Sequence, residues 1–211
     1  NSLFPELTAP PQPPRKPEVP NIPGLKLVLG FLDEQAQTEL TTWLDTRPWD
    51  ASMKRRIQQY GWKYNFKEKQ AKGQDYLGEL PPQLLLLAQR IHAQGHCPQV
   101  PNQVLVNDYA PGVGIAAHTD RDPEHTHTVL SLSLISAYPL ELRPVEDPKT
   151  KQEIWLPPGS LLVLEGEARH RWTHGIAARK SDELHGQRIP RGRRLSVTFR
   201  AMRLPPQHQA G

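Results

Sequence analysis

One histidine and one aspartate, His118 and Asp120, are separated by a single residue and could bind a metal ion together. In an extended chain, side chains two residues apart point to the same face. A distant histidine, His174, could complete a set of two imidazoles and one carboxylate that leaves coordination positions open. Such a set is typical of Fe(II) sites for oxygen chemistry, whereas structural zinc sites are closed. We therefore predict an iron site formed by these three residues.

A His-x-Asp tripeptide by itself also fits a hydrogen-bonded surface turn, and the pattern leaves the third ligand open. Four further histidines compete for the position: His125, His127, His170 and His185. The first two share a loop with a proline and a glutamate and are expected to face solvent. On a strand, His170 would share the face of His174, so it stays open as an alternative. We favour His174 because the glycine that follows it, Gly175, lets another group approach closely.

The segment Arg194–Arg200 predicts a strand with one apolar face and one polar face. The apolar face is expected to pack on the core and contains Leu195, Val197 and Phe199. The polar face contains Arg194, Ser196, Thr198 and Arg200. Burying two guanidinium groups is costly unless an anion pairs with them. A dicarboxylate fits, because a guanidinium can bind a carboxylate through two parallel hydrogen bonds and the hydroxyls can complete the set. An edge strand with a hydrated polar face is the alternative.

Two helices followed by short strands are expected to position these residues. The first helix spans Asp33–Asp45, where Asp33 is a suitable N-cap and apolar residues recur at helical spacing. The second runs from Pro82 to a stop at Gly95. Strands separated by proline and glycine turns are predicted over 104–109, 128–134, 140–143, 153–156, 161–165, 171–175 and 194–202. This order is typical of an α+β domain with a β-sandwich or jelly-roll core.

Aromatic residues alternate along the segment that leads to Phe66: Tyr60, Trp62, Tyr64 and Phe66. A period of two predicts that the four rings share one face of a strand or an extended lid. The region Lys54–Lys72 holds seven basic residues and one acid, and Arg179–Arg203 holds eight basic residues and two acids. Aromatic faces stack on bases while basic side chains contact phosphates, so a nucleic acid is the expected partner. Core aromatics and a solvated charged surface are the alternatives.

With 211 residues, of which 36% are hydrophobic and 23% charged, the chain suits one globular domain. Eight prolines without apolar periodicity predict a disordered tail over residues 1–24, a domain over 25–205 and a short tail over 206–211. A single cysteine, Cys97, excludes an internal disulfide and a zinc site built from several thiolates. No membrane-spanning run or secretory signal is visible. We expect an intracellular, cytoplasmic monomer, with the nucleus as an alternative location.

Four motifs in this order resemble the AlkB family of 2-oxoglutarate/Fe(II)-dependent dioxygenases. They are Asn107-Asp108-Tyr109-Ala110-Pro111-Gly112, His118-Thr119-Asp120, His174-Gly175-Ile176 and the strand Arg194–Arg200. The resemblance covers Leu25 to Arg203 and implies a double-stranded β-helix (jelly roll) with N-terminal helices packed on one sheet. It also implies that Asn107, Tyr109 and Arg194 bind 2-oxoglutarate and that Arg200 lies near the co-substrate and the iron. Fe(II) would then be the cofactor, and each turnover would consume the co-substrates 2-oxoglutarate and O2 and give succinate and CO2.

The resemblance leaves the substrate open among three classes. Oxidative demethylation of alkylated bases in DNA or RNA is the first, and Asp122 lies where such enzymes have a carboxylate that contacts the exocyclic amine of the base. Hydroxylation of a modified tRNA wobble uridine is the second, because three stretches resemble that branch: Lys54-Arg55-Arg56 with Tyr60-Gly61, the segment 156–161, and Trp172-Thr173-His174-Gly175-Ile176. Oxidation of a protein side chain is the third. The predicted substrate-binding residues are Arg55, Tyr60, Trp62, Tyr64 and Asp122.

Overall fold

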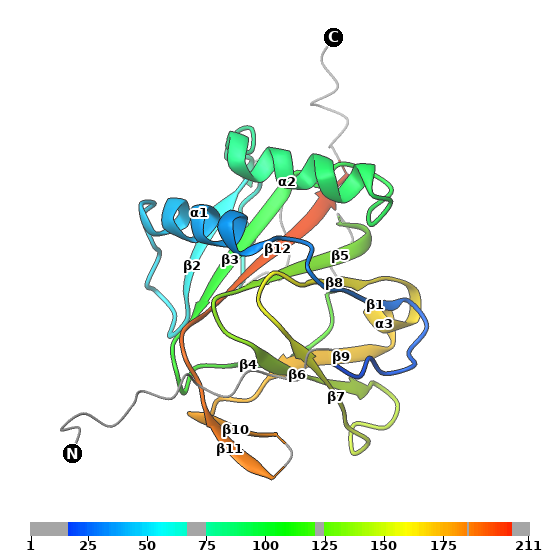
Figure 1. The fold of residues 1–211 in the computed structure, drawn as a ribbon. Helices are drawn as coiled ribbons and strands as arrows, with labels where there is room; N and C mark the ends of the chain where they lie inside the picture. Colours follow the sequence, from blue (N-terminus) through cyan, green and yellow to red (C-terminus); the bar gives the residue numbers. More distant parts are fainter. Residues whose placement is uncertain (1–16, 67–74, 121–124, 185, 204–211) are drawn as a thin grey trace, which may run out of the picture.

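Two antiparallel β-sheets face each other in the computed structural model, which describes residues 17–66, 75–120, 125–184 and 186–203 (Figure 1). The larger sheet has six strands in the order β1-β8-β5-β12-β3-β2, and the smaller sheet has four in the order β4-β9-β6-β7. From β3 to β12 the chain passes back and forth between the two sheets, which is the arrangement of a double-stranded β-helix. The α+β jelly roll expected from the sequence is therefore confirmed.

The strands of the larger sheet are β1 (Leu25–Val28), β8 (Leu161–Leu164), β5 (His125–Leu134), β12 (Arg194–Met202), β3 (Gln103–Tyr109) and β2 (Arg56–Tyr60). Those of the smaller sheet are β4 (Ile115–His118), β9 (Trp172–Ile176), β6 (Tyr138–Pro144) and β7 (Gln152–Leu156). A separate hairpin, β10 (Ser181–Leu184) and β11 (Gln187–Pro190), lies between β9 and β12 in the chain. The sequence did not predict β1, β4 or this hairpin.

Two helices, α1 (Glu34–Asp45) and α2 (Pro82–Ala93), cover the outer face of the larger sheet (Figure 1). Asp33 caps α1 as predicted, because its carboxylate accepts a 2.8 Å hydrogen bond from the Ala36 amide. The chain turns after α2 at Gly95, where φ is 74°. The buried faces of both helices pack on the outward side chains of β3, β5 and β12, which include Val106, Leu132 and Val197. The helices therefore leave the inward faces of these strands to the second sheet.

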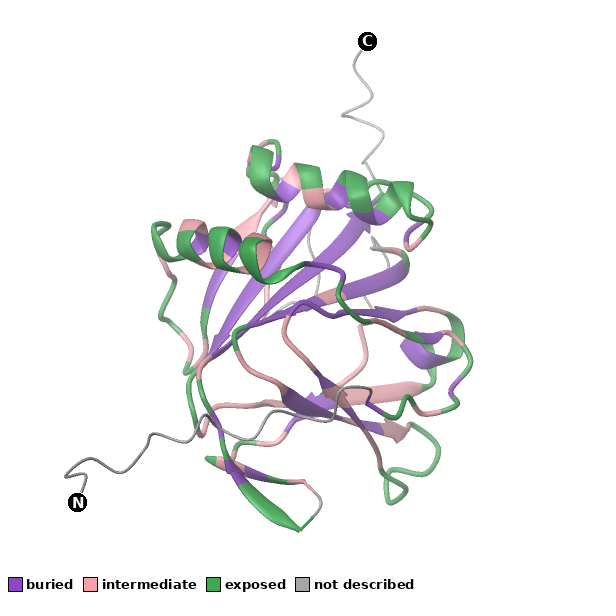
Figure 2. Cartoon of the chain, in the orientation of Figure 1, coloured by how far each residue is buried: buried purple, intermediate pink, exposed green. Residues whose placement is uncertain are grey.

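The central strands β3 and β12 are buried along their whole length (Figure 2). On β12, Leu195, Val197 and Phe199 join the core beneath the helices, as the alternation predicts. The opposite face of β12 points between the sheets and carries Arg194, Ser196, Thr198 and Arg200. Because the strand lies between β5 and β3, the alternative of an edge strand with a hydrated face is excluded.

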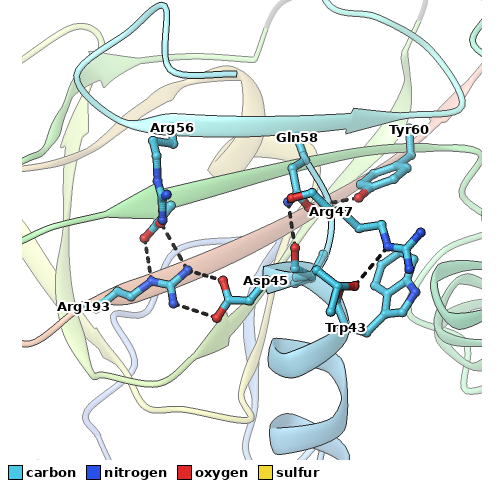
Figure 3. Close-up of polar contacts among 10 residues, drawn as sticks. Trp43, Asp45, Arg47, Arg56, Gln58, Tyr60 and Arg193 are labelled. Atoms are coloured by element: carbon cyan, nitrogen blue, oxygen red, sulfur yellow. Dashed lines mark hydrogen bonds and ion pairs between the residues drawn. The ribbon is translucent and has the colours of Figure 1, made fainter. Parts of the chain in front are cut away.

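An ion-pair cluster holds the end of α1 to the sheet (Figure 3). Arg193 donates hydrogen bonds of 2.7 and 2.9 Å to Asp45 at the end of α1, and bonds of 3.0 and 3.2 Å to Asp108 of β3. Arg56 of β2 also bonds to Asp108. Since Asp108 is 6% exposed, these two guanidinium groups compensate a buried charge, and Arg193 also holds the end of α1 against β3.

The prediction that four alternating aromatic rings share one face is wrong. Strand β2 ends at Tyr60, and Gly61 follows with φ at 74°. A Cβ at Gly61 would lie 1.8 Å from the carbonyl oxygen of Asn102, so the chain can turn here only with glycine. The turn breaks the period of two. Tyr60 packs on Trp43 of α1, with ring centroids 5.9 Å apart, and donates a hydrogen bond to Gln58 (Figure 3).

The packed region starts before the Leu25 expected from the sequence, because Ile22 is 4% exposed and belongs to the core between the sheets. Residues 1–16 and 206–211, which include most of the predicted tails, lie outside the described residues. Between β8 and β9 the chain forms a short helix, α3 (Gly166–His170), where the sequence predicted no regular element. None of the helices in the described ranges is long and apolar enough to cross a membrane.

Candidate iron and co-substrate site

The two predicted histidine ligands lie opposite each other on paired strands of the smaller sheet. His118 ends β4, and its register partner on β9 is His174. Their ring centroids are 4.4 Å apart. Asp120 follows β4 and places a carboxylate oxygen 3.6 Å from His174 Nε2. Ligand atoms of all three side chains lie within 4.8 Å of one another. The structure therefore brings the predicted triad together.

Gly175 permits this pairing, as the sequence suggested. A Cβ at Gly175 would lie 2.9 Å from the backbone nitrogen of Ala117, so a larger residue would push β9 away from β4. The rival His170 does not share a strand with His174, because it ends α3 and is exposed. His127 is exposed as well. His185 and the side chain of His125 lie outside the described residues.

Both histidines are suited to donate a lone pair to a metal ion. His118 Nδ1 lies 2.9 Å from the carbonyl oxygen of Ala116, which can only accept, so this nitrogen carries the proton and Nε2 is left for a metal. For His174, burial lowers the pKa to about 4, even though the charge of Asp120 opposes the shift. An imidazole with this pKa is neutral at physiological pH, which is the form that binds metals.

Asp120 is kept ionised by its neighbours. Burial alone would raise the pKa of this carboxyl group, but Arg200 and the two histidines outweigh burial and hold the pKa well below its usual value. Arg200 Nη2 donates a 2.8 Å hydrogen bond to Asp120 Oδ1. Arg169 of α3 fixes the backbone, donating to the carbonyl oxygens of Asp120, at 3.3 Å, and of Thr126. A permanently charged carboxylate on a restrained backbone is a suitable metal ligand.

The donor set fits Fe(II). Two neutral imidazoles and one carboxylate, drawn from one side of a strand pair, bind a divalent first-row metal and leave positions for other ligands. When bound, iron supplies the activation of O2 that couples decarboxylation of 2-oxoglutarate to oxidation of a C–H bond. His118, Asp120 and His174 would hold it.

A cavity of about 860 Å³ lies between the sheets and contains the triad in its wall. The predicted co-substrate residues line the same cavity: Asn107, Tyr109, Arg194, Ser196, Thr198 and Arg200. They come from the neighbouring strands β3 and β12, where Asn107 pairs with Ser196 and Tyr109 with Arg194. Apolar side chains of the other strands, including Leu140 and Leu164, complete the wall. The volume is in the range of small-molecule sites.

Arg194 has the features of a carboxylate-binding residue. Its side chain is 1% exposed and donates one hydrogen bond of 2.9 Å, from Nη2 to Ser133 Oγ. The guanidinium carbon lies 5.5 Å from the centroid of the Tyr109 ring and 5.8 Å from that of Tyr138. Its Nε and Nη1 atoms are buried and find no hydrogen-bond partner among the described residues. Because such donors are costly to leave unpaired, an anion that accepts from both fits this site.

The neighbouring polar groups also favour an anion. Burial raises the pKa of Tyr109, so its phenol stays protonated and can donate. Ser196 Oγ lies 2.8 Å from Ser131 Oγ on β5, and Thr198 is next along the same face of β12. Sequence reasoning missed Ser131, Ser133 and Tyr138. The serines could have been found, because they alternate with buried leucines on the strand that pairs with β12.

The predicted substrate residues divide into two groups. Arg55 and Tyr64 line the cavity, together with Met53 and Phe66, which the prediction did not assign to the substrate. Tyr60 and Trp62 do not line it, so the cavity does not support their assignment as substrate contacts, which stays a prediction. Tyr60 lies on the helix side of the sheet, and Trp62 is 2% exposed and packs against Met202. Asp122 lies outside the described residues.

Comparison with known proteins agrees with this site. Residues 25–200 match the 2OG-Fe(II) oxygenase superfamily. A protein of Acanthamoeba polyphaga mimivirus, itself uncharacterised, is 30% identical over 180 residues, which are 84% of each chain. An Arabidopsis thaliana protein named alkylated DNA repair protein ALKBH8 homolog is 31% identical over 205 residues, 87% of this chain and 59% of that protein. The chain therefore belongs to the 2OG-Fe(II) oxygenase superfamily and, within it, to the AlkB family.

The mouse tRNA (carboxymethyluridine(34)-5-O)-methyltransferase ALKBH8 is 31% identical over 169 residues, which are 72% of this chain and 25% of that protein. Among solved structures, OsALKBH1 superposes with a TM-score of 0.64 at 17% identity over 84% of this chain and 96% of that chain, which supports the fold alone. The enzyme is thus an oxidoreductase that uses Fe(II), 2-oxoglutarate and O2, as predicted. The chain spans little more than half of the Arabidopsis relative and a quarter of the mouse relative.

Proposed function

We propose that this dioxygenase oxidises a methyl group on an alkylated base of DNA or RNA. The observation that carries the proposal is that two aromatic rings, Tyr64 and Phe66, line the same cavity as the iron triad. Their centroids are 5.1 Å apart in an edge-to-face arrangement. A base that leaves its stack can be bound against such rings, at about 1–3 kcal/mol for each stacked base.

Basic side chains accompany these rings. Arg55 lines the cavity, and Lys54 and Lys63, which flank the same segment, are exposed. Exposed cations beside a cavity can contact the phosphates of a polymer while one of its bases enters. This distribution favours a nucleic acid over a small neutral substrate.

The chain itself contributes binding, orientation and exclusion of water. Arg194, Tyr109 and the β12 hydroxyls would bind the co-substrate, and the triad would hold the iron. The apolar wall formed by residues such as Leu140 and Leu164 keeps bulk water from the reacting carbon. Oxidation of a methyl carbon bound to nitrogen gives a hemiaminal, which releases formaldehyde and the unmodified base. Oxidation of a carbon bound to carbon gives a stable alcohol instead.

That difference defines the second candidate, hydroxylation of a modified tRNA wobble uridine. It is favoured by the similarity to the mouse relative, whose name refers to carboxymethyluridine at tRNA position 34. The match covers a quarter of that protein, so its name supports this candidate only as a proposal. The same cavity serves both candidates, and the product distinguishes them.

The test uses iron-loaded protein with 2-oxoglutarate, oligonucleotides that carry 1-methyladenine or 3-methylcytosine, and bulk tRNA, followed by mass spectrometry of the bases. Loss of a CH2 unit from the methylated bases together with formaldehyde release supports demethylation. Gain of one oxygen on a tRNA uridine supports the second candidate. The variant His118→Ala serves as the inactive control. No change in any base, with no binding of the oligonucleotides at low salt, would reject both and leave oxidation of a protein side chain to be tested.

A further inference from the structure

Arg55 lines the cavity and also contacts Asn107, a residue predicted to bind the co-substrate. Its Nε donates a 2.6 Å hydrogen bond to Oδ1 of Asn107. Asn107 is 5% exposed and lies in the middle of β3, opposite Ile57 of β2 on one side and Ser196 of β12 on the other. Arg55 immediately precedes β2 and reaches Asn107 from outside the double-stranded core. The amide is therefore held between the strands and the arginine.

The chemistry of the two side chains determines how the amide is oriented. An arginine can only donate hydrogen bonds, so the amide must turn its oxygen toward Arg55. The NH2 group then points away from Arg55, and both side chains line the cavity. A carboxylate or keto oxygen can only accept, so an amide flipped by 180° would present its carbonyl to an anion and repel it. The hydrogen bond from Arg55 excludes that flipped state.

We infer that Arg55 is a positioning residue for the co-substrate, and that it fixes Asn107 with its NH2 group toward 2-oxoglutarate. The inference rests on a co-substrate contact of Asn107 and does not depend on which substrate is oxidised. It also changes the role predicted for Arg55 from the sequence, which was contact with the substrate.

The same guanidinium connects the co-substrate side of the cavity to the aromatic segment. Its carbon lies 5.8 Å from the centroid of the Phe66 ring, which in turn contacts Tyr64. Arg55 therefore contacts both Asn107 on the co-substrate side of the cavity and the aromatic segment.

Binding of 2-oxoglutarate to Mn(II)-loaded protein, measured by isothermal titration calorimetry without nucleic acid, tests the inference independently of activity. Arg55→Met keeps the length of the side chain but cannot donate, and should raise Kd for 2-oxoglutarate about tenfold, as expected for loss of a charge-assisted hydrogen bond. Arg55→Lys retains a donor and should recover most of the affinity. Arg56→Met is the matched control, because this neighbour bonds to Asp108 instead of Asn107, and its Kd should stay at the wild-type value.

A double-mutant cycle separates positioning from a general loss of structure. In the Asn107→Ala background, Arg55→Met should cause no further loss of 2-oxoglutarate affinity, because the group that Arg55 orients is gone. Full additivity of the two losses would overturn the inference. So would wild-type 2-oxoglutarate affinity in Arg55→Met, and weakened oligonucleotide binding in that variant would then assign Arg55 to the substrate instead.

A second variant leaves Arg55 intact, so the test does not depend on how well its replacements fold. Asn107→Asp keeps an acceptor for Arg55 but presents oxygen atoms to the anion in place of NH2. It should bind 2-oxoglutarate more weakly than Asn107→Ala does. Binding of Asn107→Asp that equals or exceeds that of Asn107→Ala would contradict the proposed orientation of the amide.

Discussion

Arg200 and Asp120 are joined by a 2.8 Å hydrogen bond between the two halves of the site. Arg200 lies on β12 of the larger sheet, and Asp120 follows β4 of the smaller sheet. The arginine is 6% exposed and retains two buried N–H groups, Nε and Nη1, without a partner among the described residues. One side chain therefore balances the charge of a metal ligand and keeps donors available beside the cavity.

Replacing Arg200 by methionine should destabilise the metal-free protein by about 2–3 kcal/mol, because a buried carboxylate loses its paired charge. A bound divalent cation supplies the missing positive charge and should recover part of the loss. Urea unfolding with and without Mn(II) measures both quantities. An equal loss of stability in the two forms would show that Arg200 does not act through Asp120.

Arg169→Met should weaken metal binding on the order of tenfold, which is typical when a residue that orients a metal ligand through a hydrogen bond is removed. The reason is that Arg169 donates hydrogen bonds to the backbone carbonyl oxygens of Asp120 and Thr126, and so restrains the chain at the metal ligand. Arg171→Met is a suitable control, because Arg171 lies near in sequence and pairs with the exposed Glu146. Competition with a metal-sensitive dye gives the two affinities. Similar values for both variants would contradict the role given to Arg169.

Tyr64→Ala should raise KM for the nucleic-acid substrate about tenfold with a smaller change in kcat, because one stacking surface in the cavity is lost. Tyr60→Ala should change KM little and instead lower the melting temperature, because Tyr60 packs on Trp43 beneath the sheet. Steady-state kinetics and thermal unfolding of both variants check the contrast. A larger KM effect for Tyr60 than for Tyr64 would favour the shared aromatic face that the alternation predicted.

Arg193→Met should lower the free energy of unfolding by about 1–3 kcal/mol, because it removes hydrogen bonds to both Asp45 and Asp108. Figure 3 shows the guanidinium in contact with Asp45 at the end of α1. Arg47→Met is the control, since the exposed Arg47 side chain makes no ion pair among the described residues; it donates to the neighbouring Thr46 and lies 5.4 Å from the centroid of the Trp43 ring. Urea denaturation should show a loss below about 1 kcal/mol for the control. Equal effects would mean that the cluster contributes nothing specific.

The parts of the site that lie on regular strands could be predicted from the sequence. Alternation on β12 correctly separated the residues facing the helices from Arg194, Ser196, Thr198 and Arg200, because a strand places every second side chain on one face. His174 was preferred as the third ligand because the glycine that follows it permits close approach, and the register places it opposite His118.

The parts that depend on turns and on distant contacts could not be predicted. Gly61 ends the alternation after Tyr60 because of a close approach to Asn102, which is more than forty positions away and has no local signal. Arg169 reaches Asp120 from a helix of five residues, which is too short to leave a periodic pattern. Nucleic-acid binding, a cytoplasmic location and the monomeric state stay predictions.

Coupling of co-substrate turnover to base oxidation tests the central claim most directly. Iron-loaded protein is incubated with 2-oxoglutarate, O2 and an oligonucleotide carrying 1-methyladenine, and the succinate and formaldehyde formed are measured. The controls are the same oligonucleotide without the methyl group and the protein variant His118→Ala. We predict that the methylated strand stimulates succinate formation, with about one formaldehyde for each succinate, and that His118→Ala forms neither. Succinate formation that is unaffected by every modified nucleic acid, or that survives in His118→Ala, would contradict the account.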